Sequence, residues 1–287
     1  MSQFILSGFA DEIAPELDTQ IRVMKSLEIS YIEMRGVNGK NLCEHSLAQA
    51  QEIKAQLDEA GVKISAIGSP IGKINITDPF EPHLAAFRHV LDLADCLETK
   101  YIRMFSFFMP KGADPSQYRD EVLRRWQCFV DAAKGRGITL LHENEKDIYG
   151  DTPERCLDLL SSLNCEYVRA TFDPANFVQC GVEVYPHAYA MLRPYIEYMH
   201  IKDAKASDGA VTVAGRGDGH IPSVLQDLKD SGYSGFLSLE PHLTNFVGFA
   251  DLEESAEVAQ KEDMSQGAKL FAAAVASLTD ILQKVKA

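Results

Sequence analysis

Residues 140–145 read LLHENE, an apolar run that ends on the carboxylate of Glu143. Three later apolar runs end in the same way: ATFDPAN (170–176) at Asp173, YMHIKD (198–203) at His200 and LSLEPH (237–242) at Glu240. If each run is a buried strand of one parallel sheet, the four final side chains lie at the same end of neighbouring strands. Carboxylates and an imidazole that converge in this way can bind one divalent cation.

Short β-rich runs alternate with amphipathic helical segments eight times along the chain. Eight such units predict an α/β fold, a single (β/α)8 TIM barrel closed by parallel strands. The predicted strands lie near residues 4–9, 30–34, 63–67, 101–105, 139–143, 167–173, 195–201 and 236–240.

The boundaries between the predicted elements agree with this count. Thr152 followed by Pro153 is typical of a helix start, and Gly61 is placed where a helix ends before a strand. No linker rich in Pro, Gly or Ser divides the chain, so residues 1–287 are expected to form one domain. Its last part is expected to hold an active-site loop at about 242–265 and a closing C-terminal helix at about 266–285.

Strand parity predicts where the four polar side chains point. Side chains two positions apart share one face of a strand, which groups Glu143 with Leu141 and Thr139, and Glu240 with Ser238 and Phe236. The opposite parity is almost wholly apolar and suits contact with a layer of helices. The polar strand ends are therefore expected to point into the barrel.

The composition excludes several classes of partner. The chain has 42 acidic and 28 basic residues and a net charge of −14, which repels phosphate backbones and anionic membranes. No stretch offers the roughly 18 uncharged apolar residues of a transmembrane helix. The six cysteines show no CxxC spacing, which favours a reduced, cytoplasmic protein. Neither nucleic acid nor a membrane is an expected partner.

Glu143, Asp173, His200 and Glu240 form an oxygen-rich ligand set with one imidazole. Such a set favours Mn²⁺, Mg²⁺ or Co²⁺ and tolerates Zn²⁺. Each residue taken alone also has a structural interpretation, as a helix cap or as the partner of a base such as Lys202. Four of them at equivalent strand ends favour the metal site.

Six segments together resemble the xylose isomerase-like TIM barrels, the superfamily of sugar and sugar-phosphate isomerases and epimerases and of AP endonuclease family 2. These segments are HENE (142–145), YGDTPE (149–154), FDPANF (172–177), HIKDA (200–204), GRGDG (215–219) and SLEPH (238–242). The resemblance covers nearly the whole chain and says little about the substrate.

The resemblance implies one divalent metal ion held by Glu143, Asp173, His200 and Glu240, and a small-molecule carbohydrate substrate. Glu143 and Glu240 would also be the catalytic acid/base pair, facing opposite sides of a bound keto-sugar. The ion would stabilise an enediolate while one glutamate removes a proton and the other returns it. Members of this family also form homo-oligomers, so an oligomer is possible here.

Four further residues are predicted to bind the substrate, each with a structural alternative. Arg216 lies in the glycine-rich loop after the seventh strand, where barrels often bind phosphate, or is a solvated arginine. Lys202 follows His200 at strand spacing and could instead pair with a carboxylate. His242 has the parity of Glu240 and could support a ligand. Glu33 ends the second strand and could contact the substrate or orient a ligand.

Three other functions compete with an isomerase or epimerase. A dehydratase of the inosose or dehydroshikimate type would use the same metal-stabilised enediolate to expel water. An AP endonuclease would need further metal ligands, whereas Asn176, Val211 and Val213 occupy positions where such ligands are sought. A barrel that binds sugar without turnover is disfavoured by the full ligand set.

Overall fold

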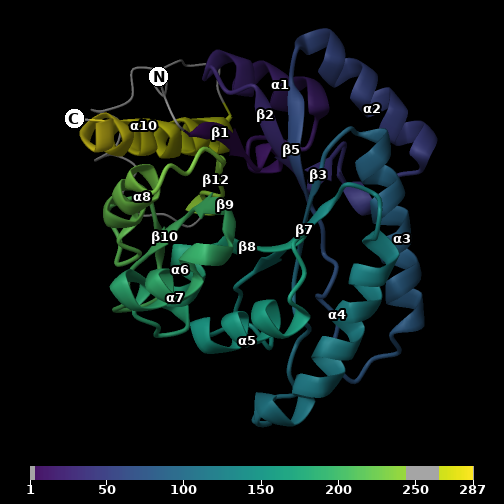
Figure 1. The fold of residues 1–287 in the computed structure, drawn as a ribbon. Helices are drawn as coiled ribbons and strands as arrows, with labels where there is room; N and C mark the ends of the chain where they lie inside the picture. Colours follow the sequence, from purple (N-terminus) through teal and green to yellow (C-terminus); the bar gives the residue numbers. More distant parts are fainter. Residues whose placement is uncertain (1–3, 244–264, 287) are drawn as a thin grey trace.

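Eight parallel strands form one sheet in the order β1-β12-β9-β8-β7-β6-β5-β2. The two end strands, β1 and β2, lie side by side, so the sheet curls into a nearly closed barrel (Figure 1). The barrel strands are β1 (Ile5–Gly8), β2 (Tyr31–Met34), β5 (Lys63–Gly68), β6 (Tyr101–Met104), β7 (Thr139–Glu143), β8 (Val168–Phe172), β9 (Ile196–Ile201) and β12 (Phe236–Leu239). The computed structural model describes residues 4–243 and 265–286. It confirms the predicted barrel and its eight strands.

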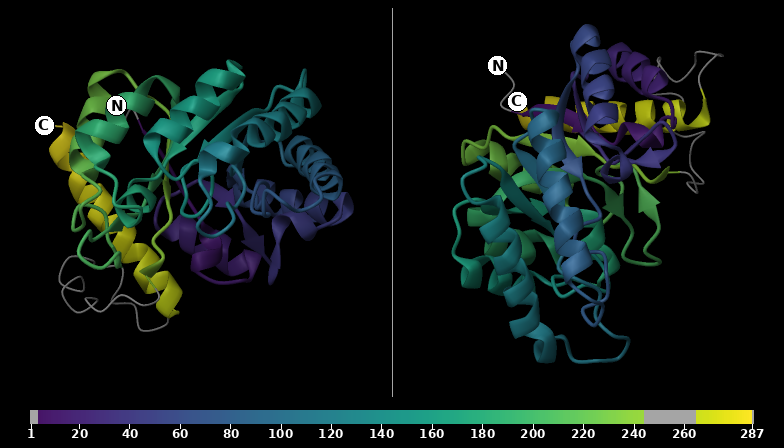
Figure 2. Two further views of the ribbon diagram at one scale, coloured as in Figure 1. Left: turned by 90° about the horizontal axis from the view of Figure 1, so that it is seen from below. Right: turned by 90° about the vertical axis from the view of Figure 1, so that its right-hand side faces the viewer.

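Helices surround the strands on the outside of the barrel (Figure 1). They are α1 (Leu17–Ser26), α2 (Leu47–Ala60), α3 (Glu81–Cys96), α4 (Arg119–Ala133), α5 (Pro153–Leu163), α6 (Pro174–Gln179), α7 (Tyr189–Leu192), α8 (Ile221–Asp230) and α10 (Gln266–Lys286). Two short antiparallel pairs, β3 (Gly36–Val37) with β4 (Lys40–Asn41) and β10 (Asp203–Ala204) with β11 (Val211–Thr212), lie in the loops. The closing helix expected at about 266–285 is α10, which lies next to α8 (Figure 2). Of the loop expected at about 242–265, residues 244–264 lie outside the described residues.

Local sequence signals set the helix ends. The Thr152 side chain accepts the backbone N–H of Arg155, which satisfies a free donor at the start of α5. Gly61 ends α2 in the left-handed conformation, with φ of 69°, which glycine adopts without steric cost. These are the positions at which the sequence predicts a helix start and a helix end.

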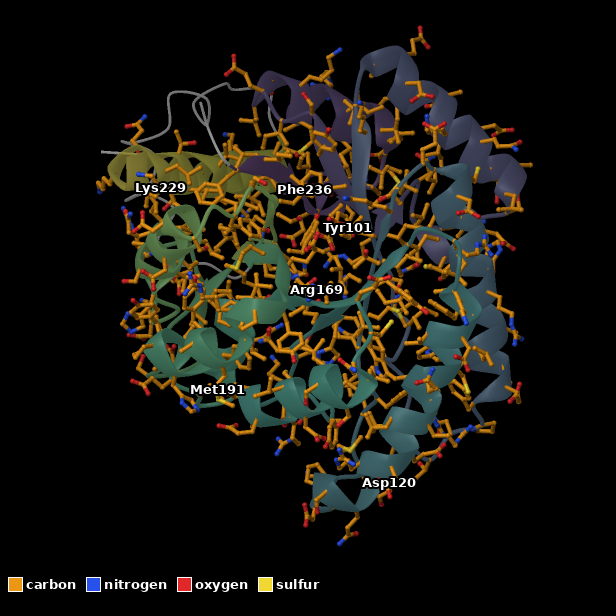
Figure 3. All side chains as sticks on the ribbon, viewed as in Figure 1. Tyr101, Asp120, Arg169, Met191, Lys229 and Phe236 are labelled. Carbon is orange, nitrogen blue, oxygen red and sulfur yellow. The ribbon has the colours of Figure 1, made fainter. Side chains whose placement is uncertain are left out.

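The interior and the exterior of the barrel are packed differently. Between strands and helices the packing is apolar and rich in aromatic rings; Phe87 of α3 and Phe129 of α4 have ring centroids 4.7 Å apart. Inside the barrel, the Ser65 hydroxyl lies 2.8 Å from that of Tyr198 and 2.6 Å from that of Ser7. Because β5 and β9 are not neighbours in the sheet, these contacts cross the interior. Side chains fill the centre of the ring, as Figure 3 shows.

Strand register brings the site residues to one level. His200 of β9 pairs with Ser238 of β12, and Thr171 of β8 pairs with Glu143 of β7. Asp173 and Glu240 follow Thr171 and Ser238 by two positions and therefore share the inward face of their strands. The carboxyl-terminal end of the barrel, where TIM-barrel enzymes place their active sites, thus collects these polar groups.

Among the helices of residues 4–243 and 265–286, none combines the length and the apolar composition that crossing a bilayer requires.

Candidate metal centre

Four side chains predicted as metal ligands converge at the carboxyl-terminal end of the barrel. Glu143, Asp173, His200 and Glu240 each offer one ligand atom, all within 4.8 Å of one another, and all four residues are buried. His200 Nδ1 lies 3.1 Å from Glu143 Oε1, 3.6 Å from Glu240 Oε2 and 3.7 Å from Asp173 Oδ2. One imidazole nitrogen therefore faces three carboxylates at once.

The other nitrogen of His200 faces Glu33. Nε2 lies 3.2 Å from Glu33 Oε2, and both side chains are fully buried. The edge of the Phe9 ring packs against the imidazole, with centroids 5.3 Å apart. Glu33 can therefore accept a hydrogen bond from the N–H at Nε2, which leaves Nδ1 free to bind a cation. Metal-binding histidines commonly have such a carboxylate partner.

Two buried bases neutralise part of the acidic cluster. Lys202 Nζ lies 2.8 Å from Asp173 Oδ2 and 3.0 Å from Glu240 Oε2. Arg103 Nε lies 3.3 Å from Glu143 Oε2. Buried carboxylates are costly unless they are paired or bind a cation, so these bases help to keep the cluster ionised.

The surroundings shift the pKa values of the cluster in different directions. Burial raises the pKa of Glu143, and the charges of His200 and Arg103 offset it only in part. Burial also opposes ionisation of Glu240, but Lys202 and His242 outweigh it and hold its pKa well below the usual range. For His200, burial lowers the pKa, yet the carboxylates of Glu143 and Glu33 outweigh burial and raise it well above the usual value. The surrounding carboxylates thus favour positive charge at the centre of the cluster.

The donor set fits a divalent cation. Three carboxylates and one imidazole suit the hard and borderline divalent ions. Asp173 Oδ2 is buried and accepts no well-aligned hydrogen bond, although Lys202 Nζ is near. It retains an unused lone pair beside the other ligand atoms. Its second oxygen, Oδ1, accepts the N–H of Asn176 at the start of α6, which holds the side chain in place.

A cavity of about 380 Å³ lies at this end of the barrel. Its lining includes Lys202 and Asn176 from the cluster, together with His242, Gln179 and Phe108. The lining is mostly polar and charged, with Phe108 and Val211 as its apolar members, which suits a small polar molecule. Lys202 and His242, two of the predicted substrate-binding residues, thus reach this cavity.

A second group of side chains adjoins the first through Glu240. Glu12, Glu240 and His242 offer ligand atoms within 4.8 Å of one another. The His242 backbone, with φ of 46°, donates its N–H to Glu12 Oε2 at 2.7 Å. Arg35 contacts the same group and donates from Nη1 to Glu240 Oε1 at 3.0 Å. Burial, with the nearby Glu240 charge, raises the pKa of Glu12 to about 7.

Arg216 does not join these groups in the structure. It is exposed and lines a separate cavity of about 660 Å³ between α8 and α10. The reason lies in its loop, which folds around the Asp203 carboxylate: Asp203 accepts the N–H groups of Gly215, Gly217 and Gly219 at 2.8, 3.0 and 2.8 Å. A side chain at Gly217 would collide with Asp203, so glycine permits this wrapping.

Glu33 is at the site but behind it. Its carboxylate is fully buried against His200 and does not line the cavity. Of its two predicted roles, the structure places it where it can orient a ligand.

Sequence reasoning missed Glu12 and the extent of the Arg35 contacts. Glu12 lies in a short helix, Ala10–Glu12, directly after β1. A signal was present, because Glu12 is an acid that follows the first predicted strand, although it lies three residues beyond the strand's end. It was weak, because the strand is short and two acids, Asp11 and Glu12, are adjacent.

The family model of the xylose isomerase-like TIM barrels matches residues 21–271. No curated protein matches this sequence.

Three solved structures share the fold. The IolI protein, solved with a bound zinc atom, is 16% identical over 98% of this chain and 99% of its own, with a TM-score of 0.73. L-ribulose 3-epimerase is 14% identical over 100% and 96%, with a TM-score of 0.70. The probable 3-DHS dehydratase AsbF from Bacillus anthracis is 18% identical over 83% and 92%, with a TM-score of 0.69. This chain belongs to the xylose isomerase-like TIM barrel family.

Proposed function

We propose that this chain is a divalent-metal-dependent isomerase or epimerase that acts on a small carbohydrate or polyol ketone by proton transfer beside the carbonyl group. The observation that carries the proposal is the placement of Glu143 and Glu240. Glu143 ends β7 and Glu240 follows β12; between them in the sheet lie β8, which Asp173 follows, and β9, which contains His200. The two glutamates therefore approach the centre of the cluster from its two ends.

This placement assigns a role to each residue. Asp173 and His200 would hold the ion, and Glu33 would keep His200 in the orientation that presents Nδ1. Glu143 and Glu240 complete the ligand set and move the proton, one removing it and the other returning it. When bound, the cation would polarise the substrate carbonyl as a Lewis acid and make the neighbouring proton easier to remove. Return to the opposite face of the same carbon gives epimerisation, and return to the adjacent carbon gives isomerisation.

The ion is proposed to be Mn²⁺, Mg²⁺ or Co²⁺, with Zn²⁺ as an alternative. Three carboxylates among four ligands favour the harder ions. Among proteins of this fold, IolI was solved with zinc, and a Mycobacterium smegmatis barrel was solved with magnesium. The cavity beside Lys202 and His242 is the proposed place of the substrate, whereas Arg216 lines a different cavity.

A dehydratase is the second candidate. Expulsion of water beside a carbonyl begins with the same proton abstraction, and the same residues would serve it. The fold is shared with a probable 3-DHS dehydratase. A cytoplasmic location, a homo-oligomer and the absence of nucleic-acid binding stay predictions.

Proton exchange in heavy water tests the proposal. The purified protein with Mn²⁺ is incubated with a panel of ketoses and inososes in D₂O, and NMR follows loss of the proton beside the carbonyl. We expect exchange with at least one compound and its loss in Glu143→Gln and Glu240→Gln. The matched control is Glu154→Gln, because Glu154 is exposed on α5 and forms its ion pair with His187. A product lighter by one water would favour the dehydratase.

Metal analysis tests the site itself. We expect about one divalent ion per chain in the wild type and none in the double variant Asp173→Asn, Glu240→Gln. Normal metal retention by that double variant would contradict the proposed ligand set.

A further inference from the structure

Glu240 divides its two carboxylate oxygens between two groups of side chains. Oε2 faces the four-residue cluster, 3.0 Å from Lys202 Nζ and 3.6 Å from His200 Nδ1. Oε1 faces the other way, 3.4 Å from His242 Nε2 and near Glu12. A carboxylate shared in this manner is the geometry of a bridging ligand between two metal ions about 3.5–4 Å apart. The side chains on the Oε1 side, two carboxylates and an imidazole, are also suitable metal ligands.

The Oε1 side already contains a cation. The Arg35 guanidinium contacts every member of the second group: Nη1 lies 3.0 Å from Glu240 Oε1 and 3.3 Å from His242 Nε2, and Nη2 lies 3.4 Å from Glu12 Oε1. It therefore occupies the position between the three side chains at which a second ion would bind.

Arg35 is also anchored from behind. Its Nε and Nη2 donate to the two oxygens of Asp11 at 2.8 and 3.2 Å, and its guanidinium carbon lies 4.6 Å from the centroid of the Phe9 ring. A guanidinium keeps its charge at every physiological pH and, being covalently attached, cannot be exchanged as an ion can. Phe9 directly follows β1 and Asp11 lies in the short helix Ala10–Glu12, whereas Arg35 follows β2.

We infer that Arg35 is a tethered cation in the place of a second divalent ion. The barrel then has a single metal site, and Glu240 Oε1 binds Arg35 in place of an ion. The inference rests on the proposed function only for the first ion. It makes Arg35 a positioning residue: it holds Glu240 Oε1 and so directs Oε2 toward the four-residue cluster.

Titration with Mn²⁺ tests the inference, with EPR of unbound Mn²⁺ and metal analysis of the purified protein as readouts. The variant is Arg35→Met, which removes the charge and keeps an apolar stem against Phe9. We expect one ion in the wild type, two in Arg35→Met, and one again in the double variant Arg35→Met, Glu12→Gln. Arg35→Lys, which keeps a tethered charge, and Arg119→Met, which removes a half-exposed arginine paired with Asp158, should each bind one ion.

Two outcomes would overturn the inference. One is a single ion in a folded Arg35→Met variant; the other is a second ion in the wild type that Glu12→Gln abolishes. If Arg35→Met does not fold, Asp11→Asn decides instead, because it loosens the anchor and should admit a second ion at high Mn²⁺. A wild type that binds no ion, together with one Glu12-dependent ion in Arg35→Met, would reject the proposed metal site and keep the inference. One ion in the wild type and one in Arg35→Met would keep the proposed metal site and reject the inference.

Discussion

Glu33 shows how one buried residue can act through another. Its carboxylate touches His200 Nε2 and does not reach the cavity, so its effect must pass through the imidazole. An anionic partner on Nε2 keeps the proton there and makes Nδ1 a better donor to a cation. Glutamine at the same position would keep the volume but lose the charge.

We therefore expect Glu33→Gln to weaken Mn²⁺ binding by about 10- to 100-fold. Isothermal titration calorimetry with the folded variant measures this, and circular dichroism checks the fold. The exposed substitution Glu154→Gln should leave the affinity unchanged. An affinity for Mn²⁺ equal to that of the wild type in Glu33→Gln would show that Glu33 does not orient the ligand.

At the scale of elements, the loop between β11 and α8 depends on Asp203. Its buried carboxylate accepts four backbone N–H groups: three from the loop, at Gly215, Gly217 and Gly219, and that of Ala204. An asparagine offers one acceptor oxygen and turns the other position into a donor that faces N–H groups. The loop would then hold buried donors without acceptors.

We expect Asp203→Asn to lower the free energy of unfolding by about 1–3 kcal/mol. Urea unfolding followed by circular dichroism measures the change. Asp208→Asn is the matched control in the neighbouring turn, since Asp208 is exposed and accepts only the Ala210 N–H in the described structure; we expect less than about 0.5 kcal/mol there. Equal losses of unfolding free energy in the two variants would show that Asp203 does not anchor the loop.

His83 links α3 to the loop after β5. Its Nε2 accepts the N–H of Gly72 at 2.7 Å, which requires an unprotonated nitrogen. Burial, assisted by Arg125, lowers the pKa of His83 to about 4 from an ordinary 6.5. Because the folded pKa is the lower one, the unfolded chain takes up the proton first as the pH falls.

Stability should therefore fall between pH 6.5 and about pH 4. The contribution of His83 is below about 1.4 kcal/mol per pH unit, since solvent screens a half-buried ring. His83→Gln, which retains an acceptor for Gly72, should flatten that part of the pH profile, measured by urea unfolding at stepped pH. His187→Gln, at an exposed surface pair, is the control and should leave the slope as it is. If the stability of His83→Gln depends on pH as steeply as that of the wild type, protonation of His83 does not cause the loss of stability.

For the whole molecule, the cluster connects strands that are distant in sequence. Glu33, Glu143, His200 and Glu240 lie at the ends of β2, β7, β9 and β12, so an ion at the centre binds only the closed barrel. A ligand that binds the folded state alone stabilises it by mass action.

We expect Mn²⁺ at 100 times its dissociation constant to stabilise the fold by about 2.7 kcal/mol and to raise the melting temperature accordingly. Differential scanning fluorimetry with and without Mn²⁺ measures the shift. The double variant Asp173→Asn, Glu240→Gln should show none. A shift of the same size in that variant would mean that Mn²⁺ stabilises the protein elsewhere.

The barrel and its polar strand ends were predictable because both depend on short-range rules. Apolar runs of four to six residues mark each strand, and the two-residue side-chain period assigns its inward face. In a parallel barrel, equivalent strand ends then meet at one level. The convergence of Asp173 and His200, on neighbouring strands, follows directly from this register.

The surroundings of Glu240 were not predictable in the same way. Arg35 and Glu12 reach it only because β1 pairs with β12 and β2 lies beside β1, which joins residues more than 200 positions apart. No local period connects these positions. The direction of Arg216 likewise depends on hydrogen bonds between its loop and Asp203, which sequence spacing does not reveal.

The sequence by itself determined the eight strands, their inward faces and the four strand ends that carry candidate ligands, because the two-residue period of a strand is a local property. Only the tertiary structure decided which base faces which oxygen: Lys202 on Glu240 Oε2, Arg35 on Oε1, and Glu33 behind His200. The physical reason is barrel closure, which sets distances of about 3 Å between side chains from opposite ends of the chain and thereby distributes the charge within the site.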